Sequence, residues 1–257
     1  MFFHLFVSIV LGAIFGSFST FLGFRIFNEN KEINLTGKRS ICCNCKHVLN
    51  FFDLIPIISF ICLRGKCRYC KKPIPIWHFL AEIFMVCSFV FATLYTKDIN
   101  KQTTLIWLIC FCLITQSIID YRTMMSSDII HFITFISSIF LSYLIGYSKY
   151  QIIITPIVIL FIFILLSYIM KKILKKDCIG FGDVKLFVAL SPLLTIEKLP
   201  IFFGLSGFFG ILFYFLLIFY YKNKQQNNDK INYKTKEINS FPFIPSIFFA
   251  FLLAFYF

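Results

Sequence analysis

Eight long apolar segments occupy most of this 257-residue chain and constrain its fold more than any other feature. An apolar segment of about 20 residues spans the hydrocarbon core of a bilayer as a helix. Because 59% of the residues are hydrophobic and only 14% are charged, a soluble domain of this size could not bury them. The sequence therefore predicts an all-α polytopic membrane protein with about eight transmembrane helices. The segments lie at residues 2–24, 77–96, 103–120, 128–147, 151–170, 183–197, 199–221 and 241–257.

The connections between these segments divide the chain into three predicted parts. Residues 1–24 form a first transmembrane helix, which we expect to be retained because it lacks the basic start and the cleavage site of a signal peptide. Residues 25–76 form a cytoplasmic loop too long to be a simple connector. Residues 77–257 form a membrane domain of seven helices.

Basic residues are concentrated in alternate connections. The odd-numbered connections, together with the adjoining Lys185, hold 21 of the 25 Lys and Arg residues. Because basic loops stay in the cytoplasm, we expect the odd connections there and both chain termini outside. The net charge of +13 thus follows from membrane topology, and without a basic stripe on a soluble domain we expect no nucleic-acid binding.

Two C-x2-C pairs lie in the loop formed by residues 25–76. Cys42 and Cys45 form the first pair, and Cys67 and Cys70 form the second. Two such pairs can close a tetrahedral four-sulfur site around zinc, and four sulfurs leave no open position for catalysis. Disulfides are disfavoured in a cytoplasmic loop. The pattern therefore predicts structural zinc, and a reduced, metal-free loop is the alternative.

Two aspartates lie at the ends of apolar segments, where a charge is costly and usually functional. Asp120 closes the third segment, and Asp183 opens the sixth within Gly180-Phe-Gly182-Asp183. The predicted topology puts both near the cytoplasmic face. Two carboxyl groups at short range share one proton, so that one takes a proton from water while the other donates to a scissile carbonyl. The glycines leave room for an extended backbone beside Asp183.

Three interpretations of these aspartates remain open on residue chemistry alone. They form the catalytic pair of a protease, the proton-coupling groups of a multi-pass transporter, or structural ion pairs with Arg122 and Lys185. Two further acidic residues have two interpretations each. Asp128 either caps a helix or supports catalysis. Glu82 either belongs to the site or pairs with a basic residue of the loop.

The order of the motifs resembles that of the bacterial type IV prepilin peptidases over nearly the whole chain. The resemblance implies that Asp120 and Asp183 are catalytic. The residues expected to support them are Gly180, Gly182, Asp128, Lys185 and Glu82. The matching stretches are Gly12-Ala-Ile-Phe-Gly16-Ser17-Phe18, the four cysteines, Asp53-Leu54-Ile55-Pro56, Glu82, Asp120 with Asp128, Gly180-Phe-Gly182-Asp183-Val-Lys185 and Phe243-Ile-Pro245.

The same resemblance implies an enzyme of the bacterial cytoplasmic membrane. It would remove the short basic leader of prepilins or pseudopilins and methylate the new N-terminus with S-adenosylmethionine. The first motif has Thr20 where the family usually has Asn, so a peptidase without methyltransferase activity is an alternative, beside the transporter. No glycine-rich motif positions the methyl donor, and the sequence leaves the oligomeric state open.

Overall fold

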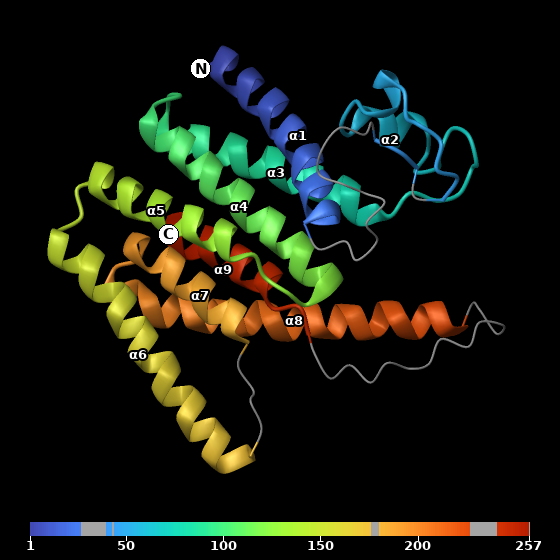
Figure 1. Ribbon diagram of the computed structural model, residues 1–257. Helices are drawn as coiled ribbons and strands as arrows, with labels where there is room; N and C mark the ends of the chain where they lie inside the picture. Colours follow the sequence, from blue (N-terminus) through green and yellow to red (C-terminus); the bar gives the residue numbers. More distant parts are fainter. Residues whose placement is uncertain (27–39, 43, 176–179, 227–240, 257) are drawn as a thin grey trace. The chain divides into compact units, whose positions relative to one another are not determined.

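The computed structural model describes residues 1–26, 40–42, 44–175, 180–226 and 241–256 (Figure 1). Within these ranges it contains helices and no strand. The α-helices are α1 (Phe2–Arg25), α2 (Ile58–Cys62), α3 (Ile76–Thr96), α4 (Lys101–Thr123), α5 (Asp128–Ile145), α6 (Lys149–Leu174), α7 (Phe181–Leu190), α8 (Leu199–Gln226) and α9 (Ile244–Tyr256). Three 3-10 turns accompany them, η1 (Phe51–Asp53), η2 (Ser191–Leu193) and η3 (Ile196–Lys198).

Each predicted apolar segment coincides with one of these helices, which confirms the all-helical membrane fold. Six helices are long and apolar enough to cross a membrane, namely α1, α3, α4, α5, α6 and α8. The other two, α7 and α9, have 10 and 13 residues and are shorter than their predicted segments. The three-part division of the chain stays a prediction.

The chain folds into two compact units, Met1–Ile119 and Asp120–Phe257. The first unit holds α1, the cysteine-bearing loop, α3 and most of α4. The second holds the last residues of α4 and the helices α5 to α9. The helix α4 is therefore shared, and Asp120 is the first residue of the second unit.

In the first unit, α1 and α3 approach each other closely at two glycines. A Cβ atom at Gly12 would lie 2.8 Å from the Cα atom of Val86, and one at Gly16 would lie 2.7 Å from the Cα atom of Glu82. Membrane helices commonly pack through small residues, because lipid provides no hydrophobic drive and close backbone contact provides van der Waals attraction. The two glycines on one face of α1 thus set its packing against α3.

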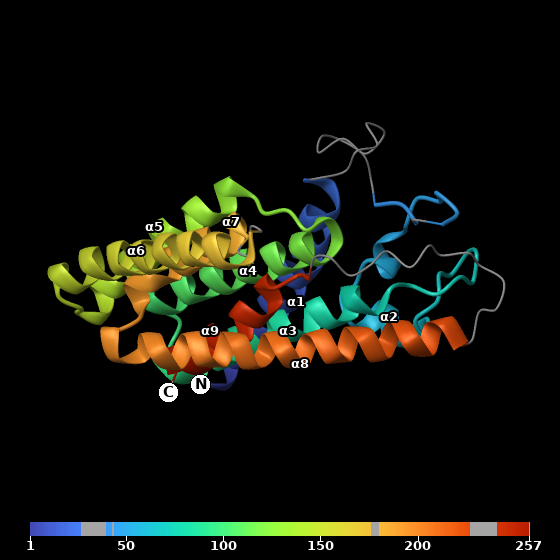
Figure 2. The same cartoon turned by 90° about the horizontal axis from the view of Figure 1, so that it is seen from below.

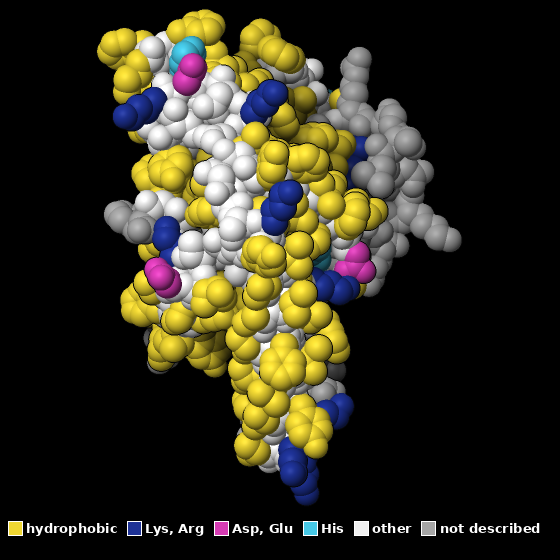
Figure 3. Space-filling view, turned by 90° about the vertical axis from the view of Figure 1, so that its left-hand side faces the viewer, with side chains coloured by type: hydrophobic (Ala, Val, Ile, Leu, Met, Phe, Trp, Pro, Cys, Tyr) yellow, Lys and Arg dark blue, Asp and Glu magenta, His cyan; other side chains and the backbone are white. Residues whose placement is uncertain are grey.

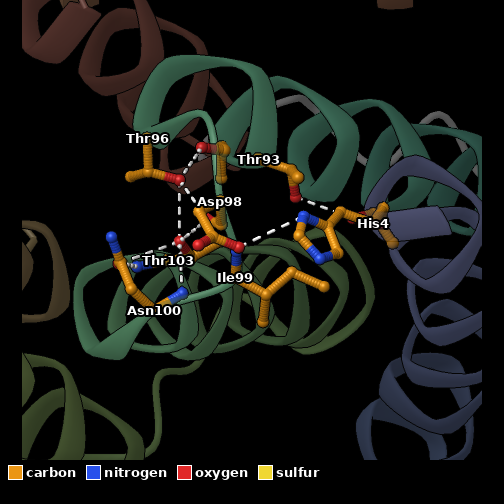
Figure 4. A network of polar contacts seen from close by, with 9 residues as sticks. His4, Thr93, Thr96, Asp98, Ile99, Asn100 and Thr103 are labelled. Carbon is orange, nitrogen blue, oxygen red and sulfur yellow. Dashed lines mark hydrogen bonds and ion pairs between the residues drawn. The ribbon is translucent and has the colours of Figure 1, made fainter. Parts of the chain in front are cut away.

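A polar cluster joins the start of α1 to the turn between α3 and α4 (Figure 4). The Nδ1 atom of His4 lies 3.1 Å from the Oδ1 atom of Asp98. The Thr103 hydroxyl donates to the Asp98 carbonyl at 2.6 Å and lies 2.7 Å from the Thr96 hydroxyl. The Asn100 side chain accepts from the Thr103 N–H at 3.0 Å. These contacts satisfy backbone groups left free where one helix ends and the next begins.

In the second unit, α7 ends early because a proline interrupts it. Pro192 lies in η2 just after Leu190, and it has no N–H with which to continue the helix. The carbonyl groups freed by this break are satisfied from neighbouring helices. Ser142 of α5 donates to the Pro192 carbonyl at 2.7 Å, and Thr155 of α6 donates to the Ser191 carbonyl at 3.0 Å. A broken helix is tolerated at membrane depth when other helices satisfy its backbone in this way.

The helix α9 forms the buried centre of the second unit. Its side chains Ile247, Phe248 and Phe251 are at most 3% exposed. It lies against α8 in both views of the ribbon (Figures 1 and 2). The helix α9 has 13 residues, fewer than a helix that spans the bilayer needs, and it is stabilised by burial among its neighbours.

The helix α6 is apolar on its exposed side and basic at its end. Figure 3 shows apolar side chains along this helix and basic ones at its tip. Lys171 and Lys172 lie in its last turn. The most exposed apolar side chains after Tyr150 are Ile153, Ile157, Phe161, Ile164, Tyr168 and Ile173. This distribution suits a helix that faces lipid and ends in a basic loop.

We expect Gly12→Ala to lower the thermal stability of the protein. The added methyl group would overlap the α3 backbone at Val86, and overpacking of this kind costs about 1–3 kcal/mol. Gly207→Ala in α8 is the matched control, because nothing lies within 4 Å of a Cβ atom there. The measurement is the midpoint of thermal unfolding in detergent micelles. Equal midpoints for the two variants would contradict the packing argument.

Candidate active site

Asp120 lies in the last turn of α4, with a buried carboxylate. The residue is 8% exposed, and its Oδ2 atom accepts a hydrogen bond from the N–H of Ile244 at 3.0 Å. The N–H of Phe243 also donates to it. Shortly beyond, Met124 adopts a φ of 53°, which ends the helix. The carboxylate is thus held by two backbone donors that belong to a segment more than 120 residues later in the chain.

That segment, residues 241–244, is called the strap below. Its start is extended because Phe241 precedes Pro242, and a residue before proline favours extended backbone. Its last residue, Ile244, is already the first residue of α9. The strap is held in place by the ring of Phe243, which would lie 2.6 Å from a Cβ atom at Gly210 of α8. Glycine at this position therefore allows the strap to reach Asp120.

Asp183 lies in the first turn of α7 and is half-buried. Gly180 is the N-terminal cap residue of this helix, and its carbonyl accepts from the Asp183 N–H at 3.1 Å. A Cβ atom at Gly180 would lie 2.9 Å from the Oδ2 atom of Asp183. The glycine therefore leaves space on one side of the carboxylate, as the motif predicted.

The fold brings the two aspartates to the same end of the second unit, although 63 residues separate them in sequence. The start of α7 lies against the connection that follows Asp120, since a Cβ atom at Gly182 would be 2.5 Å from the Oγ atom of Ser126, and the charge of Asp120 acts on Asp183. Among the described residues, no ion pair involves either aspartate. This finding disfavours the structural ion-pair interpretation. Two neighbouring carboxyl groups without a basic partner can share a proton, which is the arrangement that acid–base hydrolysis requires.

Gly182 has a different role from Gly180. A Cβ atom at Gly182 would lie 2.5 Å from the Oγ atom of Ser126, in the connection between α4 and α5. The glycine therefore permits close contact between the start of α7 and the chain that leaves Asp120. Gly180 thus leaves room for the Asp183 carboxylate, whereas Gly182 lets the start of α7 lie against Ser126.

Asp128 and Lys185 form an ion pair, with their Oδ1 and Nζ atoms 2.6 Å apart. The Asp128 side chain is 74% exposed, and the pair links the first turn of α5 to α7. Ser127 occupies the cap position of α5, so the prediction that Asp128 caps this helix is wrong by one residue. The pair joins the two helix ends near the aspartates without contacting either carboxylate.

The Glu82 carboxylate accepts a hydrogen bond from the backbone of the cysteine-bearing loop. Its Oε2 atom accepts from the Ile57 N–H at 2.7 Å, and the Ser17 hydroxyl also donates to it. Ile57 adopts a φ of 63°, a conformation that a β-branched residue rarely takes without such support. The predicted pairing of Glu82 with a basic residue is therefore not observed in the described structure. Glu82 instead attaches the loop to α1 and α3.

The two C-x2-C pairs adopt the same backbone conformation. In each, the N–H of the first cysteine donates to the carbonyl five residues later at 2.9 Å. The N–H four residues later donates back to the first cysteine at 3.0 Å. Lys46 and Lys71, which follow the second cysteines, both have a φ of 59°. The loop therefore contains two cysteine-bearing turns with the same backbone hydrogen bonds.

The geometry of the four sulfurs fits a metal ion. The sulfur atoms of Cys42, Cys45, Cys67 and Cys70 all lie within 4.8 Å of one another, and those of Cys42 and Cys70 are 4.0 Å apart. Tetrahedral zinc with bonds of about 2.3 Å places its sulfur ligands about 3.8 Å apart. All four are free thiols. The four cysteines could therefore hold a metal ion, and their arrangement is compatible with zinc.

The thiols in this cluster differ in acidity. The N–H of Cys70 points at the Cys67 sulfur and, against burial, lowers the pKa of that thiol to about 7. At Cys45 a hydrogen bond from the His47 N–H also lowers the pKa of the thiol. Desolvation and the neighbouring sulfurs of Cys42 and Cys70 outweigh this bond and raise the pKa to about 11. Like charges at short range produce this divergence, and a bound cation removes the repulsion.

Asp53 connects the loop to the second cysteine pair. Its carboxylate accepts from Arg68 at 2.6 Å and from the Tyr69 hydroxyl at 3.1 Å. Burial opposes its ionisation, but these bonds and one from the Asn50 N–H keep the pKa of Asp53 below its usual value. Asp53 therefore holds η1 against the second pair.

No sequence pattern identifies the backbone groups that hold Asp120. The N–H groups of Phe243 and Ile244 carry no side-chain signature, and the contact of Ser126 with Gly182 depends on packing. The available signal was Pro242, which marks extended chain just before an apolar helix.

Two family models match the chain. Residues 10–96 match the Bacterial Peptidase A24 N-terminal domain, and residues 107–215 match the Type IV leader peptidase family. The first match covers the cysteine pairs and Glu82, and the second covers Asp120 and Asp183. No solved structure shows significant similarity to the chain.

Several curated proteins are similar to the chain. The prepilin leader peptidase/N-methyltransferase of Vibrio cholerae is 24% identical over 210 residues, which is 79% of this chain and 82% of that protein. The protein of the same name from Aeromonas hydrophila is 28% identical over 183 residues, 71% of this chain and 63% of the relative. The type 4 prepilin-like proteins leader peptide-processing enzyme of Escherichia coli is 28% identical over 176 residues, 66% and 63% of the two chains. The chain thus spans less than two thirds of the last two relatives.

We expect Gly182→Ala to destabilise the second unit and Ser126→Gly to restore it. The added Cβ atom would overlap Ser126, at a cost of about 1–3 kcal/mol, and removal of the serine side chain would make room for it. Thermal unfolding of the two single variants and the double variant measures this coupling. Additive effects of the two substitutions would show that the contact is absent.

Proposed function

Because the chain belongs to the type IV leader peptidase family, we propose that it is a membrane aspartic endopeptidase that removes the leader of prepilins or pseudopilins. The relatives from Vibrio cholerae, Aeromonas hydrophila and Escherichia coli are all named for leader processing. One structural observation carries the proposal. Asp120, held by the strap, lies near Asp183, and within the described ranges neither aspartate forms an ion pair. Family membership favours this function over the transporter.

In the proposed mechanism, Asp120 and Asp183 hold a water molecule between them. One aspartate is ionised and takes a proton from the water, while the oxygen of that water attacks the scissile carbonyl carbon. The other, protonated, donates to the carbonyl oxygen, and the amine then leaves with a proton returned from the pair. The strap keeps Asp120 oriented throughout, because two backbone donors fix its carboxylate.

The supporting residues act on the position of the pair. Gly180 and Gly182 give Asp183 access to Asp120, and the ion pair of Asp128 with Lys185 holds the start of α7 beside α5. We assign Glu82 to attachment of the loop rather than to the reaction.

We further propose that cleavage takes place at the cytoplasmic face of the bacterial inner membrane. The basic loops support this orientation and place both termini outside. The substrate would present a short basic leader at this face, followed by an apolar helix in the bilayer.

Methylation of the new N-terminus is the second proposed activity. The relatives from Vibrio cholerae and Aeromonas hydrophila carry N-methyltransferase in their names. S-adenosylmethionine would supply the methyl group to the amine released by cleavage. A peptidase without this activity is the alternative, and the intact mass of the processed substrate distinguishes the two.

We propose that Cys42, Cys45, Cys67 and Cys70 bind one structural zinc ion. The equivalent backbone turns and the sulfur separations support it. The ion would supply the cross-link that a small loop needs in place of a large core.

We expect Asp120→Asn and Asp183→Asn each to reduce leader cleavage by at least about a hundredfold. An amide keeps the shape of the side chain but cannot exchange the proton. The measurement is the intact mass of a co-expressed prepilin, which loses its leader and gains one methyl group with the unaltered enzyme. Asp98→Asn is the matched control, because this exposed carboxylate lies in the turn between α3 and α4. Cleavage at the normal rate by either active-site variant would refute the mechanism.

We expect the purified protein to contain roughly one zinc ion per chain and Cys67→Ser to lose it, because a tetrahedral site needs all four sulfurs. Elemental analysis measures the zinc, and hydrogen exchange of residues 44–74 reports the order of the loop. Cys87→Ser is the control, since this exposed thiol of α3 lies outside the cluster. Zinc-free protein with a protected loop would disprove the assignment.

A further inference from the structure

A groove runs between α8 and α9 in the second unit. It has a volume of about 230 Å³ and is lined mainly by apolar side chains, among them Phe209, Phe213 and Leu216 of α8 and Phe249 of α9. A second hollow on α8 shares Leu216 with it and reaches Phe219. From Phe209 to Phe219 the helix rises about 15 Å, so the two hollows form an apolar track about half as long as the bilayer is thick.

One side chain in this groove is polar and has no partner. Ser246 lines the groove, is 1% exposed, and its hydroxyl makes no hydrogen bond within the described part of the chain. Other buried hydroxyls, such as those of Thr115 and Ser142, donate to the carbonyl four residues earlier in their helix. Ser246 lies in the first turn of α9, where no helical carbonyl precedes it. A buried hydroxyl without a partner is costly, so a ligand that supplies one gains affinity here.

The groove is continuous with the strap that holds Asp120. Pro245 and Ser246 line the groove, and they directly follow Ile244, whose N–H donates to the Asp120 carboxylate. A chain that enters the groove at Ser246 therefore reaches the aspartate within a few residues. The groove and the aspartate are thus joined by the consecutive residues Ile244, Pro245 and Ser246.

We propose that this groove binds the apolar helix of the prepilin substrate, immediately after the scissile bond. The proposal rests on the proposed peptidase function and names the part of the enzyme that positions the substrate. Phe209, Phe213 and Phe249 pack against apolar side chains of the helix, and the Ser246 hydroxyl bonds to its backbone.

The Ser246 hydroxyl favours the N-terminal end of a helix over a lipid acyl chain as the occupant of the groove. The first four N–H groups of a helix have no partner within it, and a hydroxyl oxygen accepts from such a group. A lipid acyl chain has no donor or acceptor and would leave the hydroxyl unsatisfied. The substrate helix begins just after the cleavage site, so its free N–H groups arrive where Ser246 lies.

Photo-crosslinking tests the occupant of the groove. A photoreactive phenylalanine analogue replaces Leu216 in the Asp183→Asn chain, which keeps the substrate uncleaved, and a tagged full-length prepilin is co-expressed. Ile157 of α6 is the control position, because its side chain is 61% exposed and that of Leu216 is 57% exposed. We expect a crosslink to the apolar helix of the prepilin from position 216 and none from position 157. Crosslinks to lipid or to a second copy of the chain alone, or equal prepilin crosslinking at both positions, overturn the proposal.

The kinetics of Ser246→Ala provide a second measurement. We expect KM for the prepilin to rise about fivefold with kcat unchanged, as for the loss of one hydrogen bond. Ser137→Ala is the control, since that hydroxyl donates to its own helix at Ile133. An unchanged KM in Ser246→Ala overturns the role of the hydroxyl. The unaltered enzyme is assayed in parallel: cleavage without a groove crosslink rejects the groove alone, whereas no cleavage rejects the peptidase.

Discussion

The hydrogen bond from the Ile244 N–H to Asp120 is the contact on which the proposed active site depends. A buried carboxylate needs donors, and backbone N–H groups supply them without a competing charge. Because these donors belong to the strap, the position of Asp120 is tied to the packing of α9 against α8. Gly210 admits the ring of Phe243 and so sets the path of the strap. One glycine on a lipid-facing helix thus helps to orient a carboxylate at the end of a different helix.

The second constraint is the cost of interrupting a helix inside a membrane. Asp183 lies in the first turn of α7, a helix of 10 residues, and a short helix has free backbone groups at both ends. At the C-terminal end, hydroxyls of Ser142 and Thr155 satisfy these groups. At the N-terminal end, glycines bring the backbone next to the connection that follows Asp120. Hydroxyl groups of α5 and α6 therefore stabilise the C-terminal end of the short helix that carries Asp183.

Much of this architecture was predictable because its causes are local in sequence. Apolar length predicted eight helices, and the spacing of Cys42, Cys45, Cys67 and Cys70 predicted a cluster whose sulfurs the structure brings together. The early end of α7 was missed because apolar length alone does not register the effect of Pro192. The strap and the Asp128–Lys185 pair were not predictable, since they depend on which helix ends meet in space. Motif order and topology predicted the roles of Asp120 and Asp183. The structure adds that the start of α7 lies against the connection that follows Asp120.

The helix α4 gives the two units a physical connection. It begins in the first unit, where Asn100 and Thr103 cap it, and its last turn carries Asp120 in the second. The polar cluster at His4 and Asp98 is built on the same turn that starts α4, so backbone N–H groups at that end find acceptors within the first unit. At the other end, the Asp120 carboxylate accepts from the strap within the second unit. Each end of α4 is thus satisfied by the unit to which it belongs.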